Sequence, residues 1–377
     1  MLKGLKLILW AWVVLVSAMP CYSTSSVIAP EELNNDIGPA LKRLHIEKEF
    51  LSHLCNELQV TLPSDIFVPF KGAHGNNFVL LTPEKGQIIF RIFSQEQLTR
   101  EGDRVDFECE VLEFLNKRQY PAPYLLKFKE GPTVYYDSKA KVYCYKAFPG
   151  KTLSSYPIRE EIVKKVSEFL TSFREKAEGF TSQLSSRQIP ASDLLTIYHT
   201  EGKIYKRLTK LLEDYPALKV HTLFQSMLGD VQNAGLVTRL EAQKSGIVHG
   251  DFYSPNIIID EQESLYLIDF GLVHLGYQVM DIILGVITVP CYAPGQWELE
   301  WVKTFLSPQK KWLKENDIGF PLFCDVVKLN CLRYGIATLP RTMGQENKTA
   351  EENPYLMIYA QLQASHLLEN LQDYYMS

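Results

Sequence analysis

The stretch His249-Gly250-Asp251-Phe252-Tyr253-Ser254-Pro255-Asn256, followed shortly by Leu267-Ile268-Asp269-Phe270-Gly271, carries the strongest structural signal in this chain of 377 residues. Between the two segments, residues 257–259 predict a buried strand, because the run is too short and too β-branched for a helix. The polar residues 260–264 predict a turn, and the apolar residues 265–268 predict a second strand. A hairpin of these strands would bring Asp251, Asn256 and Asp269 to one edge.

Those three side chains suit the transfer of a phosphoryl group. Mg²⁺ prefers hard oxygen ligands such as those of Asn256 and Asp269, and it shares them with phosphate oxygens. Asp251 is then the candidate base. Each residue alone has an ordinary structural explanation, because Asp and Asn are favoured in turns. The complete strand-turn-strand context favours the functional interpretation.

The chain resembles the aminoglycoside phosphotransferase, choline kinase and homoserine kinase superfamily, which is built like a protein kinase. The family pattern H-G-D-x-x-x-x-N, then I-D, then a further aspartate falls on His249, Gly250, Asp251, Asn256, Ile268, Asp269 and Asp281. The resemblance implies an α+β, two-lobed, protein-kinase-like fold. A small N-terminal lobe with an antiparallel sheet would precede a larger, mainly helical C-terminal lobe.

The same resemblance implies a role for each matching residue. Asp251 would accept or orient the proton of the attacking hydroxyl group, and His249 would brace the catalytic loop. Asn256 and Asp269 would hold magnesium. We interpret Asp281 as a structural residue that caps or braces the loop.

A nucleotide-binding half is expected before this segment. Residues 78–82 and 87–93 predict two strands joined by the turn 83–86. Just before them, the loop 71–77 contains Gly72 and Gly75 and could close over the phosphates of a nucleotide. Two glycines are equally typical of an ordinary strand connection, so only the position of the loop favours this role.

Arg91 interrupts an apolar face of the second strand and therefore needs a partner. The next helix, predicted over 106–117, offers Glu108 on its buried stripe and Glu110 on its solvated face, so we predict an ion pair between Arg91 and Glu108. By the family resemblance, Arg91 replaces the usual lysine that contacts the α and β phosphates, which a guanidinium group can bind in a bidentate way. The alternative is an edge-strand arginine with its head in solvent.

Strands are also predicted at about 124–136 and 141–148. The segment 145–150 resembles the hinge of the family, whose backbone pairs with adenine, so this resemblance assigns Lys146 and Phe148 to nucleotide binding. The expected division is a signal-like leader over residues 1–26, a nucleotide-binding lobe over 27–148, and a catalytic and substrate-binding lobe over 149–377.

The region after the hinge is predicted to be helical. Apolar residues at helical spacing predict a helix over 159–174, and further helices are expected at about 192–213, 219–244, 279–287, 296–315, 319–340 and 352–375. Trp297, Trp301 and Phe305 recur every four residues. They could cage a quaternary ammonium group such as choline, but we favour a packing stripe.

A protein kinase is a close alternative. Protein kinases have arginine at the position of Gly250, and after the equivalent of Asp269 they need a long activation segment that ends in Ala-Pro-Glu. Here a new apolar run begins near Asp281, which leaves no extended platform for a peptide. A small hydroxyl compound is therefore the expected acceptor.

Composition fits an ordinary globular enzyme. The chain is 46% hydrophobic, which is enough for a large core. Its net charge of -5, without any block of Lys and Arg, argues against nucleic-acid binding. The seven cysteines stand at irregular spacing, which favours a reducing compartment over a disulfide framework. No pattern predicts an oligomeric state.

The N-terminus resembles a signal peptide. Residues 7–16 form an apolar run after Lys3 and Lys6, and residues 16–18 fit a cleavage site. The run is short for a membrane span, so no stable span is expected. An export signal, a short anchor and an upstream start codon with Met19 as the true first residue all remain open. We expect a cytoplasmic protein, with export as the alternative.

The sequence thus predicts a phosphotransferase with an alcohol group as acceptor. It would use ATP and Mg²⁺ to phosphorylate a hydroxyl group of choline, ethanolamine, homoserine, an aminoglycoside or a similar small molecule. The alternative is a nucleotide-binding pseudokinase, or an exported interaction protein, without turnover. Every catalytic polar position is filled, which argues against that alternative.

Overall fold

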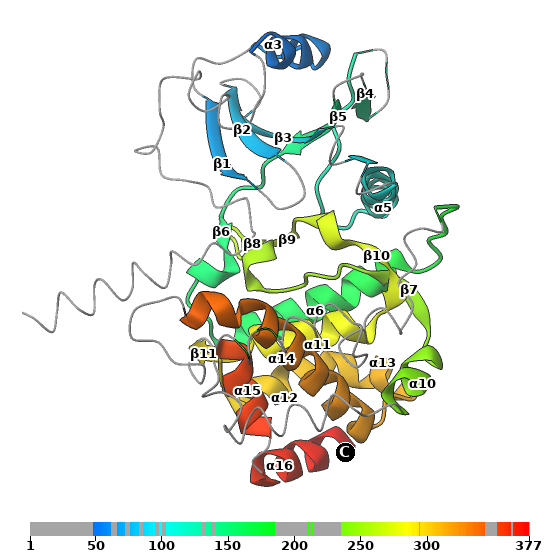
Figure 1. Ribbon diagram of the computed structural model, residues 1–377, viewed down its shortest axis with the longest axis vertical. Coiled ribbons are helices and arrows are strands. Elements are labelled where there is room, and N and C mark those ends of the chain that lie inside the picture. The colour runs from blue at the N-terminus through cyan, green and yellow to red at the C-terminus, as the bar shows by residue number, and fades with distance from the viewer. Residues whose placement is uncertain are drawn as a thin grey trace, which may run out of the picture. The chain divides into compact units, whose positions relative to one another are not determined.

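The computed structural model describes residues 48–61, 66–71, 76–82, 86–94, 98–99, 103–129, 131, 133–136, 140–184, 210, 213, 235–293, 295–343, 353–362 and 365–376 (Figure 1). By contacts between residues, the chain divides into two compact units. The first runs to Pro157 and takes in Pro255–Gly271, and the second consists of Ile158–Ser254 and the chain from Leu272. Gly72, Gly75 and the leader lie outside the described residues, and the expected boundary between 148 and 149 stays a prediction.

The first unit contains the predicted antiparallel sheet. Its order is β1-β2-β3-β5-β4, formed by β1 (Ile66–Lys71), β2 (Asn76–Thr82), β3 (Gly86–Ser94), β5 (Ala140–Lys146) and β4 (Val134–Tyr136). The hairpin of β2 and β3 matches the two strands predicted from residues 78–93. Side chains alternate along β3 because successive residues of a strand point to opposite faces.

One face of β3 belongs to the core of this unit. Ile88, Phe90 and Ile92 are buried and pack in one cluster with Leu51 and Leu54 of helix α3 (Lys48–Glu57). Full burial of an Ile or Phe side chain contributes about 1.5–3 kcal/mol relative to exposure. The opposite face carries Arg91, so the core holds the strand that positions the charge.

Helix α5 (Arg104–Lys117) follows β3 in the chain and begins two residues before the predicted start. The strand predicted at about 124–136 is wrong for most of its length. Leu125 makes only an isolated bridge to Tyr145, and β4 covers three residues. Between them the backbone leaves β5, because the Lys129 amide donates to the Glu57 carbonyl group at the end of α3.

A second sheet in the same unit holds the predicted hairpin. Its order is β6-β8-β9, formed by β6 (Lys151–Thr152), β8 (Ile257–Ile259) and β9 (Leu265–Leu267). Asp260 closes the turn by accepting hydrogen bonds from the amides of Gln262 and Ser264, at 2.9 and 2.7 Å. Gly150 has a φ of 115°, and a Cβ there would lie 2.2 Å from the Ile259 carbonyl oxygen, so only glycine fits.

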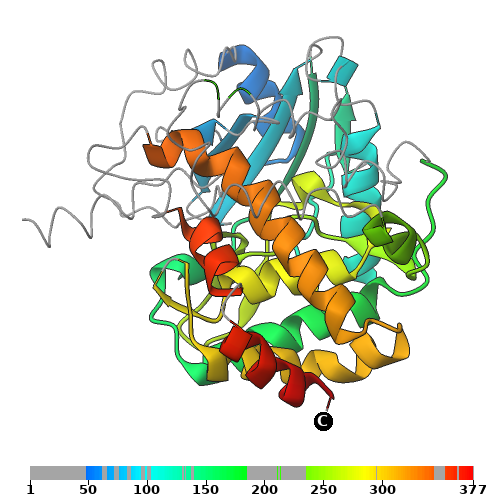
Figure 2. The same cartoon turned by 60° about the horizontal axis from the view of Figure 1, so that its bottom comes forward.

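The second unit is mainly helical. It contains α6 (Glu160–Ala177), α10 (Gly235–Glu241), α11 (Val279–Thr288), α12 (Leu299–Leu306), α13 (Lys310–Glu315), α14 (Phe320–Met343), α15 (Pro354–Leu362) and α16 (Ser365–Met376). Figure 2 shows the long α14 in orange beside the yellow α11, against which it packs. Two short antiparallel pairs join β7 (Ser245–Val248) to β10 (His274–Tyr277), and β11 (Cys291–Ala293) to β12 (Gln296–Trp297).

Several predicted helices in this unit need correction. The helix predicted at 296–315 is divided into α12 and α13 by a 3₁₀ turn at Ser307–Gln309, because Pro308 has no amide proton to continue an α-helix. Of the helices predicted at 192–213 and 219–244, most residues lie outside the described parts. Trp297 and Phe305 are buried in packing roles, but Trp297 lies in β12, so the predicted stripe along one helix is wrong at that residue. Among the described helices, none is long and apolar enough to cross a membrane.

The antiparallel sheet of the first unit and the helices of the second confirm the predicted α+β fold class. The strands β7 and β10 were missed in the sequence. Both are four residues long and each contains a glycine, so neither shows the β-branched run that marked β8.

Candidate active site

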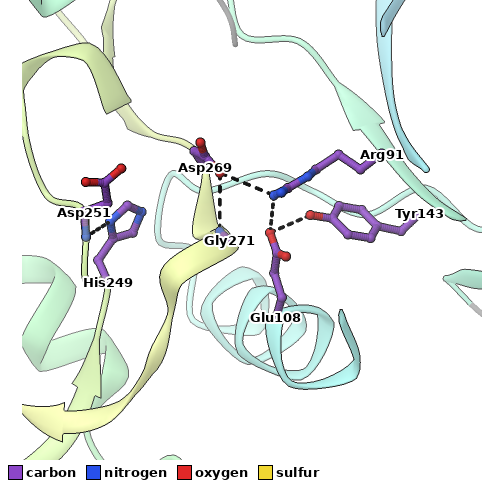
Figure 3. Close-up of polar contacts among 7 residues, drawn as sticks. All are labelled: Arg91, Glu108, Tyr143, His249, Asp251, Asp269 and Gly271. Atoms are coloured by element: carbon purple, nitrogen blue, oxygen red, sulfur yellow. Dashed lines mark hydrogen bonds and ion pairs between the residues drawn. The ribbon is translucent and has the colours of Figure 1, made fainter. Parts of the chain in front are cut away.

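A buried ion pair lies at the centre of the first unit. Arg91 stands in the middle of β3, and its Nη1 atom donates to Glu108 Oε1 on α5 at 2.6 Å (Figure 3). Arg91 is 5% exposed and Glu108 is 1% exposed, whereas Glu110 is exposed. The predicted choice of Glu108 over Glu110 is therefore confirmed, because the helix phase turns only Glu108 toward the sheet.

Tyr143 is a third member of this cluster that sequence reasoning missed. It lies opposite Arg91 in the register of β3 and β5, and its hydroxyl group donates to Glu108 Oε1 at 2.5 Å. The Arg91 guanidinium carbon also lies 5.7 Å from the centre of the Tyr143 ring, and 5.4 Å from that of Phe93. No local pattern could have identified this role, because only the register of β3 and β5 puts Tyr143 on the same face as Arg91.

The surroundings of Arg91 favour its charged form. Burial alone would lower the pKa of Arg91, but Glu108 first, then Tyr143 and Asp269, hold that pKa well above its ordinary value. The Arg91 Nε and Glu108 Oε2 atoms are buried without a hydrogen-bond partner in the described part of the chain. The pair thus keeps further donor and acceptor capacity.

Asp269 follows β9 and approaches the same cluster. Its Oδ1 atom lies 3.5 Å from Arg91 Nη1 and accepts a long hydrogen bond of 3.4 Å from the Gly271 amide. Asp269 has a φ of 59°, a left-handed conformation that Asp tolerates better than most residues. A Cβ at Gly271 would lie 3.1 Å from Asp269 Oδ1 and 3.1 Å from the Nη2 atoms of Arg91 and Arg104, so glycine relieves this crowding.

Asn256 lies at the same end of the hairpin as Asp269. It is fully buried, and its carbonyl group accepts a hydrogen bond of 2.9 Å from the Ile268 amide. This bond continues the ladder of β8 and β9 by one residue. It therefore places the two candidate metal ligands on adjacent segments of the hairpin. Their hard oxygen atoms fit Mg²⁺, which commonly takes one or two protein ligands and keeps water and phosphate oxygens for the rest. Among the described residues, no group of three or more His, Cys, Asp or Glu forms a metal site.

The candidate catalytic loop, residues 249–251, belongs to the second unit and is held through its backbone. The amides of His249 and Gly250 donate to the two carboxylate oxygens of Asp281, at 2.6 and 2.9 Å. Gly250 has a φ of 79°, and a Cβ there would lie 2.6 Å from the Leu272 carbonyl oxygen. The structural role expected for Asp281 is confirmed, because these bonds fix the two residues that precede Asp251.

His249 and Asp251 are joined within this loop. The Asp251 amide donates to His249 Nδ1 at 3.3 Å (Figure 3), and the His249 ring meets Phe173 edge-on at 6.4 Å. His249 is fully buried, whereas Asp251 is partly exposed. His249 therefore has the position of a bracing residue and Asp251 that of a residue open to substrate, while their catalytic roles stay predictions.

The expected hinge residues, Lys146 and Phe148, lie at and just after the end of β5. Lys146 ends that strand with an exposed side chain, and the amide of Ala147 donates to the Gln87 carbonyl group at 2.9 Å. The Phe148 ring stacks on Tyr266 of β9, with 4.4 Å between ring centres. This contact explains why an aromatic residue stands here, and nucleotide binding by Lys146 and Phe148 stays a prediction.

Comparisons with known proteins test the family and the fold, and they confirm the predicted protein-kinase-like fold. Residues 66–304 match the sequence model of the phosphotransferase enzyme family. No curated protein sequence matches the chain significantly.

Three solved structures are similar in fold. An amicoumacin kinase in complex with AMP-PNP, Ca²⁺ and Ami has a TM-score of 0.59 at 13% identity, over 89% of this chain and 96% of the other. A spectinomycin phosphotransferase in complex with ADP and its antibiotic has a TM-score of 0.55 at 9% identity, over 85% and 96%. A microcompartment-associated aminopropanol kinase has a TM-score of 0.51 at 13% identity, over 88% and 99%.

The buried pair yields a prediction about stability. A double-mutant cycle of Arg91→Met and Glu108→Gln, measured by urea unfolding, should show a coupling energy of about 0.5–3 kcal/mol, because the side chains are in direct contact. Each single change should destabilise strongly, since it leaves a buried charge alone. Glu110→Ala serves as the control and should change stability by less than about 0.5 kcal/mol. Additive effects of the two changes would contradict the pairing.

Proposed function

The chain belongs to the phosphotransferase enzyme family, and we propose that it uses ATP and Mg²⁺ to phosphorylate a hydroxyl group of a small molecule. The enzyme class expected from the sequence, a phosphotransferase that acts on a hydroxyl group, is confirmed by this membership and by the kinases of similar fold. The observation that carries the proposal is that Arg91 forms ion pairs with both Glu108 and Asp269 in the first unit. This cluster combines a fixed cation with a candidate metal ligand, as a polyphosphate site requires.

Arg91 is proposed to bind the phosphates of the nucleotide. Glu108 holds its Nη1 atom and is itself hydrogen-bonded by Tyr143, so the planar guanidinium group can offer further donors to phosphate oxygens in a bidentate arrangement. Because protein groups already fix the guanidinium group, little side-chain entropy would be lost on binding. This support compensates for the absence of the usual lysine.

Asn256 and Asp269 are proposed to hold Mg²⁺. The bound ion would neutralise charge that develops on the transferred phosphoryl group. The weak 3.5 Å contact between Arg91 and Asp269 leaves the carboxylate one-fifth exposed and able to take a ligand.

Asp251 is proposed to accept or orient the proton of the acceptor hydroxyl group. Its amide is tied to His249, and the two preceding amides are tied to Asp281, so the backbone that carries the carboxylate is fixed. Positioning of this kind supplies much of the rate in phosphoryl transfer, where the protein does little covalent chemistry.

The acceptor is proposed to be a small molecule with both amino and hydroxyl groups. The named substrates of the similar structures, spectinomycin and aminopropanol, support this class. Choline, ethanolamine, homoserine and aminoglycosides remain candidates. A screen of ATP consumption over such compounds tests the proposal, and a chain that binds nucleotide but turns over no alcohol would favour the pseudokinase alternative.

The role of Asp251 yields a prediction about turnover. Asp251→Asn should lower kcat by about 10²–10⁴-fold, because it removes the proton acceptor. Nucleotide affinity, measured by calorimetry, should stay close to that of the wild type. Glu261→Gln is the control, since Glu261 lies exposed in the turn after β8. Turnover at the wild-type rate in Asp251→Asn would remove this residue from the mechanism.

The metal ligands yield a prediction about ligand-dependent stability. In the wild type, ATP with Mg²⁺ should raise the melting temperature more than ATP with EDTA does. Asp269→Ala should abolish that difference, because it removes the anionic ligand. Asp317→Ala, at a surface turn, is the control. An unchanged Mg²⁺-dependent shift in Asp269→Ala would show that the metal site lies elsewhere.

We propose a cytoplasmic location, where ATP is available. The six described cysteines are free, and five of them are buried, which suits a reducing compartment. A chain expressed from Met19 should bind nucleotide as the full-length chain does, because the leader supplies no part of the proposed site. Recovery of active protein from membranes, with residues 1–18 still attached on N-terminal sequencing, would contradict this location.

A further inference from the structure

Arg174 is a buried charge in the second unit that the proposed mechanism does not use. It lies on α6 and is 4% exposed. Its Nε, Nη1 and Nη2 atoms have no hydrogen-bond partner in the described part of the chain, and its guanidinium carbon lies 4.9 Å from the centre of the Trp312 ring. Buried charges are normally paired and hydrogen-bonded, so a purely structural arginine would be a poor choice at this position.

The charge that acts on Arg174 most strongly is that of Asp281. Burial lowers the pKa of Arg174 to about 10, and Asp281 opposes that change more than the exposed Glu175 does. Helix α6 packs against α11, which carries Asp281, and against β7, which leads into the catalytic loop. One residue before Arg174, Phe173 meets the His249 ring. Helix α6 therefore contacts both α11, which carries Asp281, and His249 of the loop that Asp281 holds.

Among the described residues, Asp281 has few other charged or titratable neighbours, and His274 of β10 lies beside Gly250. His249 faces it from the loop, and both of its oxygens accept backbone amides there. From α14, which also packs on α11, the neutral Asn330 lies beside Met280. Helix α12 carries Glu300 and Lys303, which pair with each other at the surface. Arg174 is thus the cation that favours the charged form of Asp281.

This balance matters because Asp281 titrates near neutral pH. Burial raises the pKa of Asp281 to about 7, and the two amides and Arg174 oppose the rise. An ionised carboxylate accepts hydrogen bonds roughly twice as strong as those of a neutral group. Loss of the Arg174 charge would therefore protonate Asp281 at a higher pH and weaken its hold on the loop.

We propose that Arg174 is a positioning residue, whose buried and un-hydrogen-bonded guanidinium group keeps Asp281 charged and so fixes the backbone of His249 and Gly250. Its consequence for turnover rests on the proposed function of Asp251, whereas its effect on Asp281 does not. Arg174 makes no directed hydrogen bond, so its effect on Asp281 acts through charge. A lysine at position 174 should therefore have the same effect.

The test uses NMR of the full chain without nucleotide or acceptor. Labelling with ¹³C-carbonyl histidine and ¹⁵N-glycine selects only the His-Gly pairs, which are His74-Gly75 and His249-Gly250. The Gly250 signal is the one whose titration changes in Asp281→Asn. The titration step that this variant removes reports the ionisation of Asp281 through the hydrogen bond between them, and a step that remains belongs to another group beside Gly250, such as the ring of His274.

The wild-type signal should titrate near pH 7, following Asp281. In Arg174→Met the midpoint should move to higher pH by about half a unit or more, and Arg174→Lys should restore it toward the wild-type value. Lys164→Met removes an exposed charge from the same helix and should leave the midpoint unchanged. A folded Arg174→Met protein with the wild-type midpoint would overturn the proposal.

A second comparison covers the case in which Arg174→Met does not fold. The double variant Arg174→Met with Asp281→Asn removes both charges, so it should fold where the single variant does not. Failure of both to fold would show that Arg174 serves packing on Trp312, and would overturn the proposal. The NMR measurement needs no turnover, so the two proposals can fail separately. If the titration behaves as expected but the chain phosphorylates no alcohol, only the proposed function is refuted.

Discussion

A guanidinium group at the centre of an apolar strand must find its counter-charges inside the protein, and this constraint governs the first unit. Arg91 is placed by β3, Glu108 by α5 and Asp269 by the end of β9. Apolar packing already fixes each of these elements. The ion pair therefore does not have to supply the free energy that orders them. Removal of one partner would leave a buried charge, which costs far more than the net gain from the pair.

The second unit solves a related problem with a carboxylate. Asp281 lies in an apolar helix, and its charge is stabilised by two loop amides and by Arg174. The same bonds hold the loop from which Asp251 projects. In each unit a buried charged group therefore positions the residues around the proposed site. The carboxylates of Asp251 and Asp269 are partly exposed and remain available for chemistry.

Some of this arrangement could be predicted from sequence because it depends on local patterns. The isoleucines of β8 and the polar turn after them identify the hairpin, and the 3.6-residue period of α5 separates Glu108 from Glu110. Other parts had no local signal. Residues 127–129 look extended in sequence, yet they leave the sheet, and the Lys129 amide binds the end of α3 instead. Tyr143 has the appearance of a core aromatic residue until its register with Arg91 is known.

By itself, the sequence determined the class of the protein, its two-part α+β organisation and the residues that carry the expected chemistry. These follow from short spacings, such as the five positions from Asp251 to Asn256, because local backbone geometry fixes where residues so close in sequence lie. The pairing of Arg91 with Glu108 was also predictable, but only the tertiary structure decided that Asp269 approaches Arg91 and that Arg174 acts on Asp281. Arg174 and Asp281 are 107 positions apart by their numbering, and no periodicity along the chain relates them. Their interaction exists because two helices pack together, and packing of this kind is set by the shape of the whole core.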